Sequence, residues 1–372
     1  MAGNRRQGRL KAAFHLPPKR FTIKAFFTFG RLNKQRAFIL SDCDYLECQA
    51  KPHALLTANP TRGHHFIAQT EQRQHAFNPQ VNPQNQNVYC WPLSLLHKPY
   101  RGKVLSVNIE GNLEAPDLYT LTHLEGSEGK QYNLENWFNR HESGHEESCN
   151  SLRVLPSGRQ KVPRAMWRVL QLKLLDVLRN PYNRSSLFVH HLHQVLSRHL
   201  PQISSEFTAL IAARADEDVA PILQTFGFTF DEYTAWLANL YGMLSEGVHH
   251  PSLFERLFAS LFACPGLRLE LYRYDDAAHC AFFADSGYCL QASAIELSIG
   301  FSVSADMFAI VHISRGHWQH FAIATDAMPP QLSAEINVHD NNHTQRITYN
   351  HLCVRQAHEA VYGKSALRSA YF

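Results

Sequence analysis

The sequence PRAMWRVLQLKLLDVLRNP, residues 163–181, decides how the middle of the chain folds. Its apolar side chains recur every three or four residues, at Met166, Leu170, Leu174 and Val177. That spacing places them on one face of an α-helix. A proline is tolerated in the first turn of a helix and stops a helix that it follows, so the segment predicts a helix from Pro163 to Asn180.

Similar patterns predict further helices in this part of the chain. They cover residues 185–200, 204–213, 230–246 and 251–263. The predicted helix over 185–200 contains His190, His191 and His193, but it is also rich in leucine, phenylalanine and valine. Histidines in such a helix pack or face solvent more often than they bind a metal. We therefore predict a helical middle over residues 163–263 and assign these histidines no function.

The pattern changes after Pro265-Gly266. Short runs of β-forming residues follow, separated by Asp, Gly and Ser turns, at residues 267–272, 279–284, 295–303, 307–313 and 321–324. They predict a largely antiparallel, β-rich part over 267–340, and a last helix is expected over 350–362. Together with the helical middle, this predicts an α+β fold in which residues 61–372 form one mixed domain.

The first sixty residues differ from this domain. Apolar and polar side chains alternate from Phe21 to Phe29, and a turn sequence follows at Gly30-Arg31-Leu32-Asn33. We predict a β-hairpin in an extension over 17–60, which leaves residues 1–16 as a basic flexible tail. A polar loop over 78–87, interrupted by two prolines, makes the part that follows irregular.

Positive charge is concentrated at the N-terminus. Ten Lys and Arg residues precede the first acidic residue, Asp42, whereas the whole chain carries only +4, so the rest of the chain is net acidic. A basic arm on an acidic body is typical of a segment that contacts phosphate groups through charge. The predicted nucleic-acid contacts in this arm are Arg5, Arg6, Arg9, Lys11, Lys19 and Arg20.

What the sequence lacks excludes several classes of protein. No apolar run is long enough to span a bilayer and no secretory signal is visible, which predicts a cytoplasmic protein without a membrane partner. The eight cysteines form no Cys-x-x-Cys pair, so neither a zinc ribbon nor a disulfide framework is expected. The glycine motifs of NTPases, dinucleotide enzymes and serine hydrolases are absent. The sequence leaves the oligomeric state open.

The strongest candidate site is GHHFIAQ, residues 63–69, with Arg73 just beyond it. Two imidazoles, an amide and a guanidinium in so short a stretch can move a proton, hold an anion or bind a divalent metal. The interleaved Phe66-Ile67 predicts a partly buried setting. The candidate catalytic residues here are His64, His65, Gln69 and Arg73.

This motif resembles the opening of the bacterial family called domain of unknown function 4238, whose members begin with His-His-aromatic-aliphatic-Pro-Gln and then an Arg. The resemblance covers roughly residues 60–365. Later stretches that are similar to the family are Val88-Tyr89, Asn108-Ile109, Asp117-Leu118-Tyr119, Leu134-Glu135, His141-Glu142 and residues 281–287. Such bacterial domains are suspected of roles in phage defence or toxicity, so the resemblance implies a bacterial protein of that kind.

Two positions depart from the family pattern. Ala68 stands in place of the usual Pro, and the family's Ser-Asp-Asn-Pro element is Ala284-Asp285-Ser286-Gly287 here, so only Asp285 carries over. A His pair, an Arg and an Asp in one pocket suit phosphodiester hydrolysis, with His as acid or base, Arg on the phosphate and Asp on a divalent metal. A nuclease-type hydrolase that acts on nucleic acid is therefore the first hypothesis.

Two other hypotheses stay open. His141-Glu142-Ser143-Gly144-His145 satisfies His-Glu-x-x-His, which on one helix places two imidazoles on a zinc ion and makes Glu142 the general base of a metalloprotease. Its polar surroundings and Gly144 disfavour such a helix. The third hypothesis is a noncatalytic binding or sensor protein, in which the side chains of residues 64–73 tie a loop to the core through hydrogen bonds.

Overall fold

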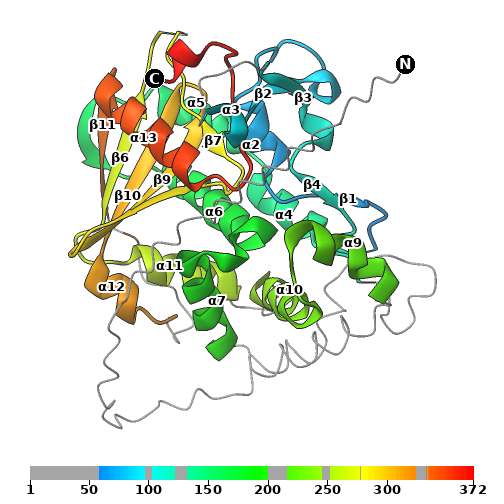
Figure 1. Ribbon diagram of the computed structural model, residues 1–372. Helices are drawn as coiled ribbons and strands as arrows, with labels where there is room; N and C mark the ends of the chain where they lie inside the picture. Colours follow the sequence, from blue (N-terminus) through cyan, green and yellow to red (C-terminus); the bar gives the residue numbers. More distant parts are fainter. Residues whose placement is uncertain are drawn as a thin grey trace, which may run out of the picture. The chain divides into compact units, whose positions relative to one another are not determined.

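Figure 1 presents a computed structural model of the chain. The structure describes residues 58–96, 103–121, 132–199, 216–244, 252–276, 278–323, 332 and 334–372. The predicted basic tail with its nucleic-acid contacts, the predicted hairpin and the predicted helix over 204–213 lie outside these residues. The other candidate site residues lie within them.

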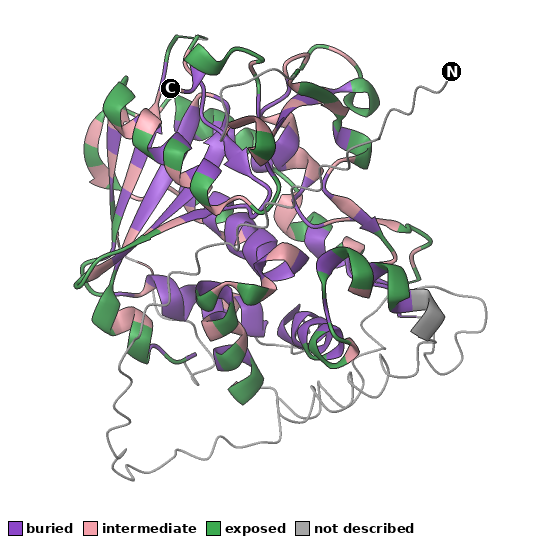
Figure 2. Cartoon of the chain, in the orientation of Figure 1, coloured by how far each residue is buried: buried purple, intermediate pink, exposed green. Residues whose placement is uncertain are grey.

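Helix α6 (Arg164–Arg179) forms where the sequence predicts a helix. Pro163 and Asn180 flank it in extended conformations, as the two prolines require. Its Met, Val and Leu side chains are buried, and Figure 2 shows the helix coloured as buried along most of its length. It packs against α4 (Glu135–Glu142), α5 (His145–Arg153) and α7 (Leu187–His199).

Three more helices of the middle part lie among the described residues. α10 (Phe230–Leu244) and α11 (Leu253–Phe262) lie where they are predicted, and α11 begins with a capping box between Ser252 and Glu255. α9 (Asp216–Phe226) is not predicted by the sequence. It contains Pro221, and a proline inside a helical pattern normally indicates the end of a helix.

A six-stranded sheet forms most of the C-terminal part. Its strand order is β5 (Gly158–Lys161), β11 (Glu335–Asp340), β6 (Arg268–Arg273), β10 (Met307–Ser314), β9 (Glu296–Ser304) and β8 (Cys289–Ala292). The β11–β6 pair is parallel and the other pairs are antiparallel. The prediction of a largely antiparallel, β-rich C-terminal part is confirmed.

This sheet separates two apolar cores. Side chains alternate across each strand, so Leu269 and Leu271 of β6 face the core that contains α6, whereas Tyr272 faces the other. The second core includes Phe308 and the buried face of α13 (His343–Gln356), where the rings of Phe308 and Tyr349 stack 4.2 Å apart. Each face of the sheet is therefore covered by helix.

The end of the chain differs from its prediction. The last helix, α13, covers 343–356 and not 350–362, and Asn342 caps it by accepting a hydrogen bond from the Gln345 amide. Ala360–Gly363 is a buried strand, β12, and it pairs with two other strands. Tertiary pairing overrides the local helical pattern there. The resulting four-stranded sheet has the order β3 (Leu105–Asn108), β2 (Asn87–Pro92), β12 and β7 (Phe283–Ala284).

The remaining elements are short. They are β1 (Gly63–His65), α2 (Gln69–Arg73), α3 (Leu93–Leu96), β4 (Glu114–Pro116) and α12 (Arg315–His320). The observed class is α+β with a helical middle, as predicted. In the part of the chain that the structure describes, no helix has the length and apolar character needed to cross a membrane.

Charged side chains lie on the buried face of α6. Lys173, Asp176 and Arg179 are fully buried and follow one another at intervals of three residues. Lys173 forms an ion pair with the buried Glu71 of α2, and Arg179 forms ion pairs with Asp176 at 2.7 Å and with Glu142 of α4 at 2.9 Å. These pairs fix α2 and α4 against the central helix.

Lys173→Met is expected to lower the free energy of unfolding by about 3 kcal/mol, because it leaves the Glu71 carboxylate buried without its cation. Urea denaturation followed by circular dichroism measures this loss. The double variant Glu71→Gln/Lys173→Met should recover most of it, since no ion is then left alone. Lys161→Met, at an exposed position of β5, is the matched control; an equal loss in that variant would contradict the prediction.

Candidate functional site

The two histidines of the motif lie on opposite faces of a strand. β1 pairs with β4, so that His64 is opposite Ala115 and His65 is opposite Glu114. Successive side chains of a strand point to opposite faces. The His pair is therefore not one site with two imidazoles, as the sequence hypothesis assumed, and each ring has its own set of partners.

His64 is held inside the core. Its side chain is fully buried, its Nε2 lies 3.0 Å from the Thr61 carbonyl, and its Nδ1 accepts a hydrogen bond of 2.9 Å from the Tyr119 amide. The imidazole also stacks on the Tyr119 ring with 5.4 Å between centroids. These contacts tie β1 to the segment after β4, which is a structural role.

His65 belongs to a chain of polar side chains at the start of α2. Its Nε2 lies 3.0 Å from the Glu110 carbonyl and 3.1 Å from Nε2 of Gln69. The Oε1 of Gln69 in turn accepts a hydrogen bond of 2.7 Å from the Arg73 guanidinium, one helical turn further on. The structure therefore brings together three of the predicted residues, His65, Gln69 and Arg73.

Carboxylates that come from other elements surround His65. Glu114 Oε2 lies 3.7 Å from its Nε2, and the absence of a side chain at Gly63 leaves room for that carboxylate. Glu135 and Glu142 of α4 lie near the buried Arg179, whose guanidinium also covers the Phe138 ring at 4.4 Å. Arg179 and Glu142 both act electrostatically on His65.

Burial shifts the acid and the base of this cluster in opposite directions. It lowers the pKa of His65 to about 4, and the nearby Arg179 adds to the effect. Burial raises the pKa of Glu135 to about 7, and the neighbouring Glu142 and Glu114 raise it further, against the opposite effect of Arg179. Burial also raises the pKa of Glu114. At neutral pH the cluster therefore combines an uncharged imidazole with a carboxyl group, that of Glu135, whose pKa lies near 7.

Most of these partners were not identified from the sequence as site residues. The resemblance included Glu135 and Glu142, but it gave neither of them a role around His65. Glu114 and Arg179 were missed. A signal for Arg179 exists in the sequence, because Lys173, Asp176 and Arg179 interrupt an otherwise apolar helix at positions that share one face.

Asp285 has a different environment from the one expected. It is buried, and its carboxylate accepts hydrogen bonds from the backbone amides of His358, Glu359 and Ala360 at 2.7, 2.5 and 2.9 Å. Both carboxylate oxygens are therefore occupied, and Asp285 fixes the start of β12. It is not placed to bind a cation beside His65 and Arg73 as the first hypothesis required. In the turn after it, Gly287 lies next to the Ile67 side chain of the motif.

The His-Glu-x-x-His sequence does not lie on one helix. α4 ends at Glu142 and α5 begins at His145, and between them Gly144 adopts a left-handed conformation with φ of 77°. The Glu142 carboxylate binds Arg179, and His145 is buried with its Nε2 3.5 Å from Sγ of Cys149. The helical geometry of a zinc protease is absent because the glycine breaks the helix.

Among the residues that the structure describes, no group of three or more His, Cys, Asp or Glu side chains is arranged to hold a metal ion.

The turn between α4 and α5 borders a surface pocket of about 890 Å³ that Thr70, Asn139 and Glu142 help to line. Glu142 therefore connects this pocket with the buried Arg179.

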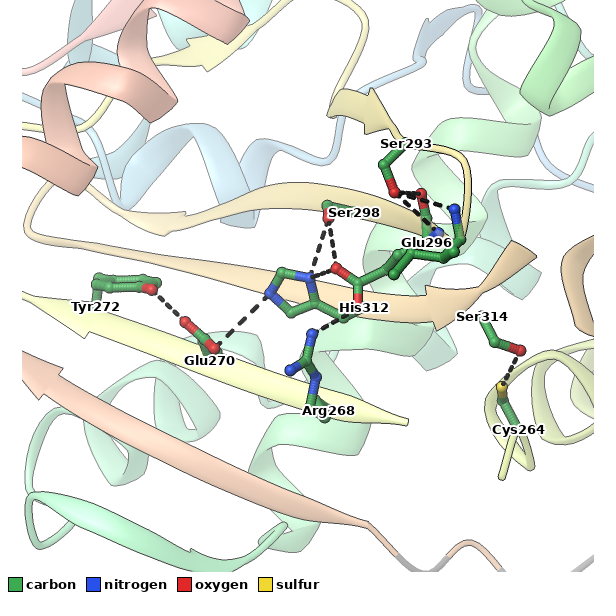
Figure 3. A network of polar contacts seen from close by, with 10 residues as sticks. Cys264, Arg268, Glu270, Tyr272, Ser293, Glu296, Ser298, His312 and Ser314 are labelled. Atoms are coloured by element: carbon green, nitrogen blue, oxygen red, sulfur yellow. Dashed lines mark hydrogen bonds and ion pairs between the residues drawn. The ribbon is translucent and has the colours of Figure 1, made fainter. Parts of the chain in front are cut away.

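A second polar cluster lies on the six-stranded sheet, away from the motif. Figure 3 shows the imidazole of His312 between two glutamates, with Nδ1 2.8 Å from Glu296 and Nε2 3.9 Å from Glu270. Arg268 pairs with Glu296, and Tyr272 donates a hydrogen bond to Glu270. The charged groups are paired with one another across β6, β10 and β9, which indicates that they hold the strands together.

Comparisons of the chain with protein-family models, with curated proteins and with solved structures found no match. The resemblance to the domain of unknown function 4238 family stays a prediction.

The free energy of unfolding should fall on acidification, because the folded protein buries His145 without a proton. Burial lowers its pKa to about 3, whereas an imidazole in the unfolded chain has a pKa of about 6.5. Between these values the unfolded chain binds the extra proton, so stability is lost as the pH falls from about 6.5 to about 3. His145→Gln should reduce the slope of unfolding free energy against pH by up to about 1.4 kcal/mol per unit.

Urea denaturation at a series of pH values measures that slope. His320→Gln, at an exposed position of α12, should leave it unchanged. A slope for His145→Gln equal to that of the parent protein would show that His145 is already protonated in the folded state.

Proposed function

We propose that this protein is a hydrolase of phosphodiester bonds in nucleic acid and that His65 is its proton acceptor. The observation that carries the proposal is the cluster of opposed acid and base around His65. General acid–base hydrolysis needs an uncharged imidazole, a carboxyl group with a pKa near 7 and a cation for the phosphate, and His65, Glu135 and Arg73 are such groups.

The proposed roles follow from position. His65 accepts a proton from the attacking water, and Glu114, 3.7 Å away, stabilises the imidazolium that forms. Glu135 donates its proton to the oxygen that leaves phosphorus. Arg73, oriented by Gln69, binds the phosphate oxygens, because a guanidinium matches them in geometry and charge.

Nucleic acid is proposed as the substrate on the charge of the sequence. Ten positive residues before Asp42 provide a polyanion contact that does not depend on base sequence. The proposed role in phage defence or toxicity rests on the family resemblance alone.

His65→Gln is expected to lower the rate of cleavage by at least about a hundredfold with little change in melting temperature, because glutamine keeps a hydrogen-bonding group and removes the base. Fluorophore-labelled single- and double-stranded RNA and DNA, separated on denaturing gels, serve as substrates. His320→Gln is the matched control and should keep full activity. Equal rates for His65→Gln and the parent protein would contradict the role of His65.

The pH dependence of the rate provides a separate test. Activity requires His65 without a proton and Glu135 with one, so the profile should rise through a pKa of about 4 and fall through a pKa of about 7. Glu135→Gln should abolish the alkaline limb along with most of the activity. A profile that stays flat from pH 5 to pH 9 would contradict the assignment.

A second candidate function is a noncatalytic binding or sensor protein. It is favoured by the full burial of His64 and Asp285, whose polar atoms are engaged by the backbone of Tyr119 and of residues 358–360. That candidate expects no cleavage of any of the substrates. It also expects His65→Gln to change melting temperature more than any other property.

A further inference from the structure

A cavity of about 470 Å³ lies between helices α7 and α10, which Figure 1 shows side by side below α6. It does not include any residue of the His65 cluster. Its volume is within the range of pockets that hold small organic ligands. We propose that it binds a nucleoside monophosphate.

The charged residues of the cavity favour an anionic ligand. Arg184 and Arg198 line the cavity together with one carboxylate, that of Glu232. The guanidinium of Arg184 is fixed, because its Nε donates to the Phe226 carbonyl at 3.0 Å and its Nη1 lies 3.3 Å from Glu232. Arg198 is exposed. Two guanidinium groups against one carboxylate favour an anionic ligand, and a guanidinium matches a phosphate in geometry and charge.

The cavity also has an aromatic wall. Phe228 and Trp236 are both buried and line the cavity, with 5.4 Å between their ring centroids. The Arg184 guanidinium lies 5.1 Å from the Phe228 ring, so positive charge and aromatic surface adjoin each other. A ligand that joins a phosphate to a flat ring system can use both, and nucleobases stack on aromatic and guanidinium surfaces.

Uncharged polar groups complete the lining. Ser197 and Asn239 hydrogen-bond to each other at 3.1 to 3.2 Å, and the Asn239 amide lies 3.5 Å from Nδ1 of His193. Burial lowers the pKa of His193 to about 4, so at neutral pH its imidazole carries no charge. Such groups can recognise the hydroxyl groups of a sugar, which a site for inorganic phosphate alone would not need.

The cavity wall is connected to the His65 cluster. The Trp236 indole donates a hydrogen bond of 3.1 Å to the carbonyl of Leu178, the residue before Arg179. The Trp236 ring also contacts Tyr119, whose hydroxyl bonds to the Arg179 carbonyl. A ligand in the cavity therefore changes the surroundings of Trp236, and tryptophan fluorescence can report its binding.

The test is isothermal titration calorimetry of the full chain with adenosine 5′-monophosphate as the probe, with tryptophan fluorescence recorded in parallel. Adenosine and inorganic phosphate are titrated separately. We expect one site per chain with a Kd below about 1 mM, and at least tenfold weaker binding of either part alone. Equal affinity for inorganic phosphate would overturn the nucleotide assignment, and no binding of the monophosphate up to 5-fold above that concentration would overturn the site.

Three variants locate the site. Arg198→Gln removes an exposed charge and should weaken binding at least tenfold, and Ala235→Trp, at an exposed cavity position of α10, should block entry. Arg355→Gln, exposed on α13, is the matched control and should bind as the parent protein does. Binding that survives both cavity variants would contradict the proposal. His65→Gln should retain binding, so this result is independent of the proposed hydrolysis.

Discussion

The structure depends on the ionic groups buried along α6. Lys173 and Arg179 both lie on α6, and their partners Glu71 and Glu142 come from α2 and α4. Removing an ion from water costs several kcal/mol unless an opposite charge with good geometry replaces the water. The ion pairs therefore favour the observed docking of α2 and α4 on α6. The motif that leads into α2 and the carboxylates of α4 are positioned together as a result.

The same burial explains the chemistry proposed for the cluster. A low-dielectric setting disfavours the charged form of every group, which lowers the pKa of an imidazole and raises that of a carboxyl group. His65 and Glu135 thus reach complementary protonation states through one physical cause. Arg179 moderates the effect at Glu135 and strengthens it at His65. A charge that holds the fold together thereby also adjusts both groups of the candidate site.

Sequence periodicity predicted the elements that bury a regular apolar face, such as the helix over 163–180 and the strands over 268–273, 296–304 and 307–314, whereas residues 321–323 of another expected strand form none. It failed at 360–363, because the pairing of β12 with β2 and β7 is set by distant residues. The sequence located the motif of the candidate site, but the alternation of side chains along β1 places His64 and His65 on opposite faces of the strand. Glu114 and Arg179 could not be placed around His65, since their proximity depends on how β4 and α6 pack. The sequence hypothesis gave Asp285 a catalytic role, because sequence alone does not distinguish a buried carboxylate that binds backbone amides from one that binds a metal.

The position of β12 has a consequence for synthesis. This strand lies between β2 and β7, and Asp285 binds the amides at its start, yet residues 93–359 separate it from β2 along the chain. At roughly 5–20 residues per second, the β2–β3 hairpin waits on the order of tens of seconds for its central neighbour. During that time one edge of β2 offers unpaired amides and carbonyls to other chains. The nascent protein thus passes through an interval in which this strand edge favours aggregation, until β12 is made and covers it.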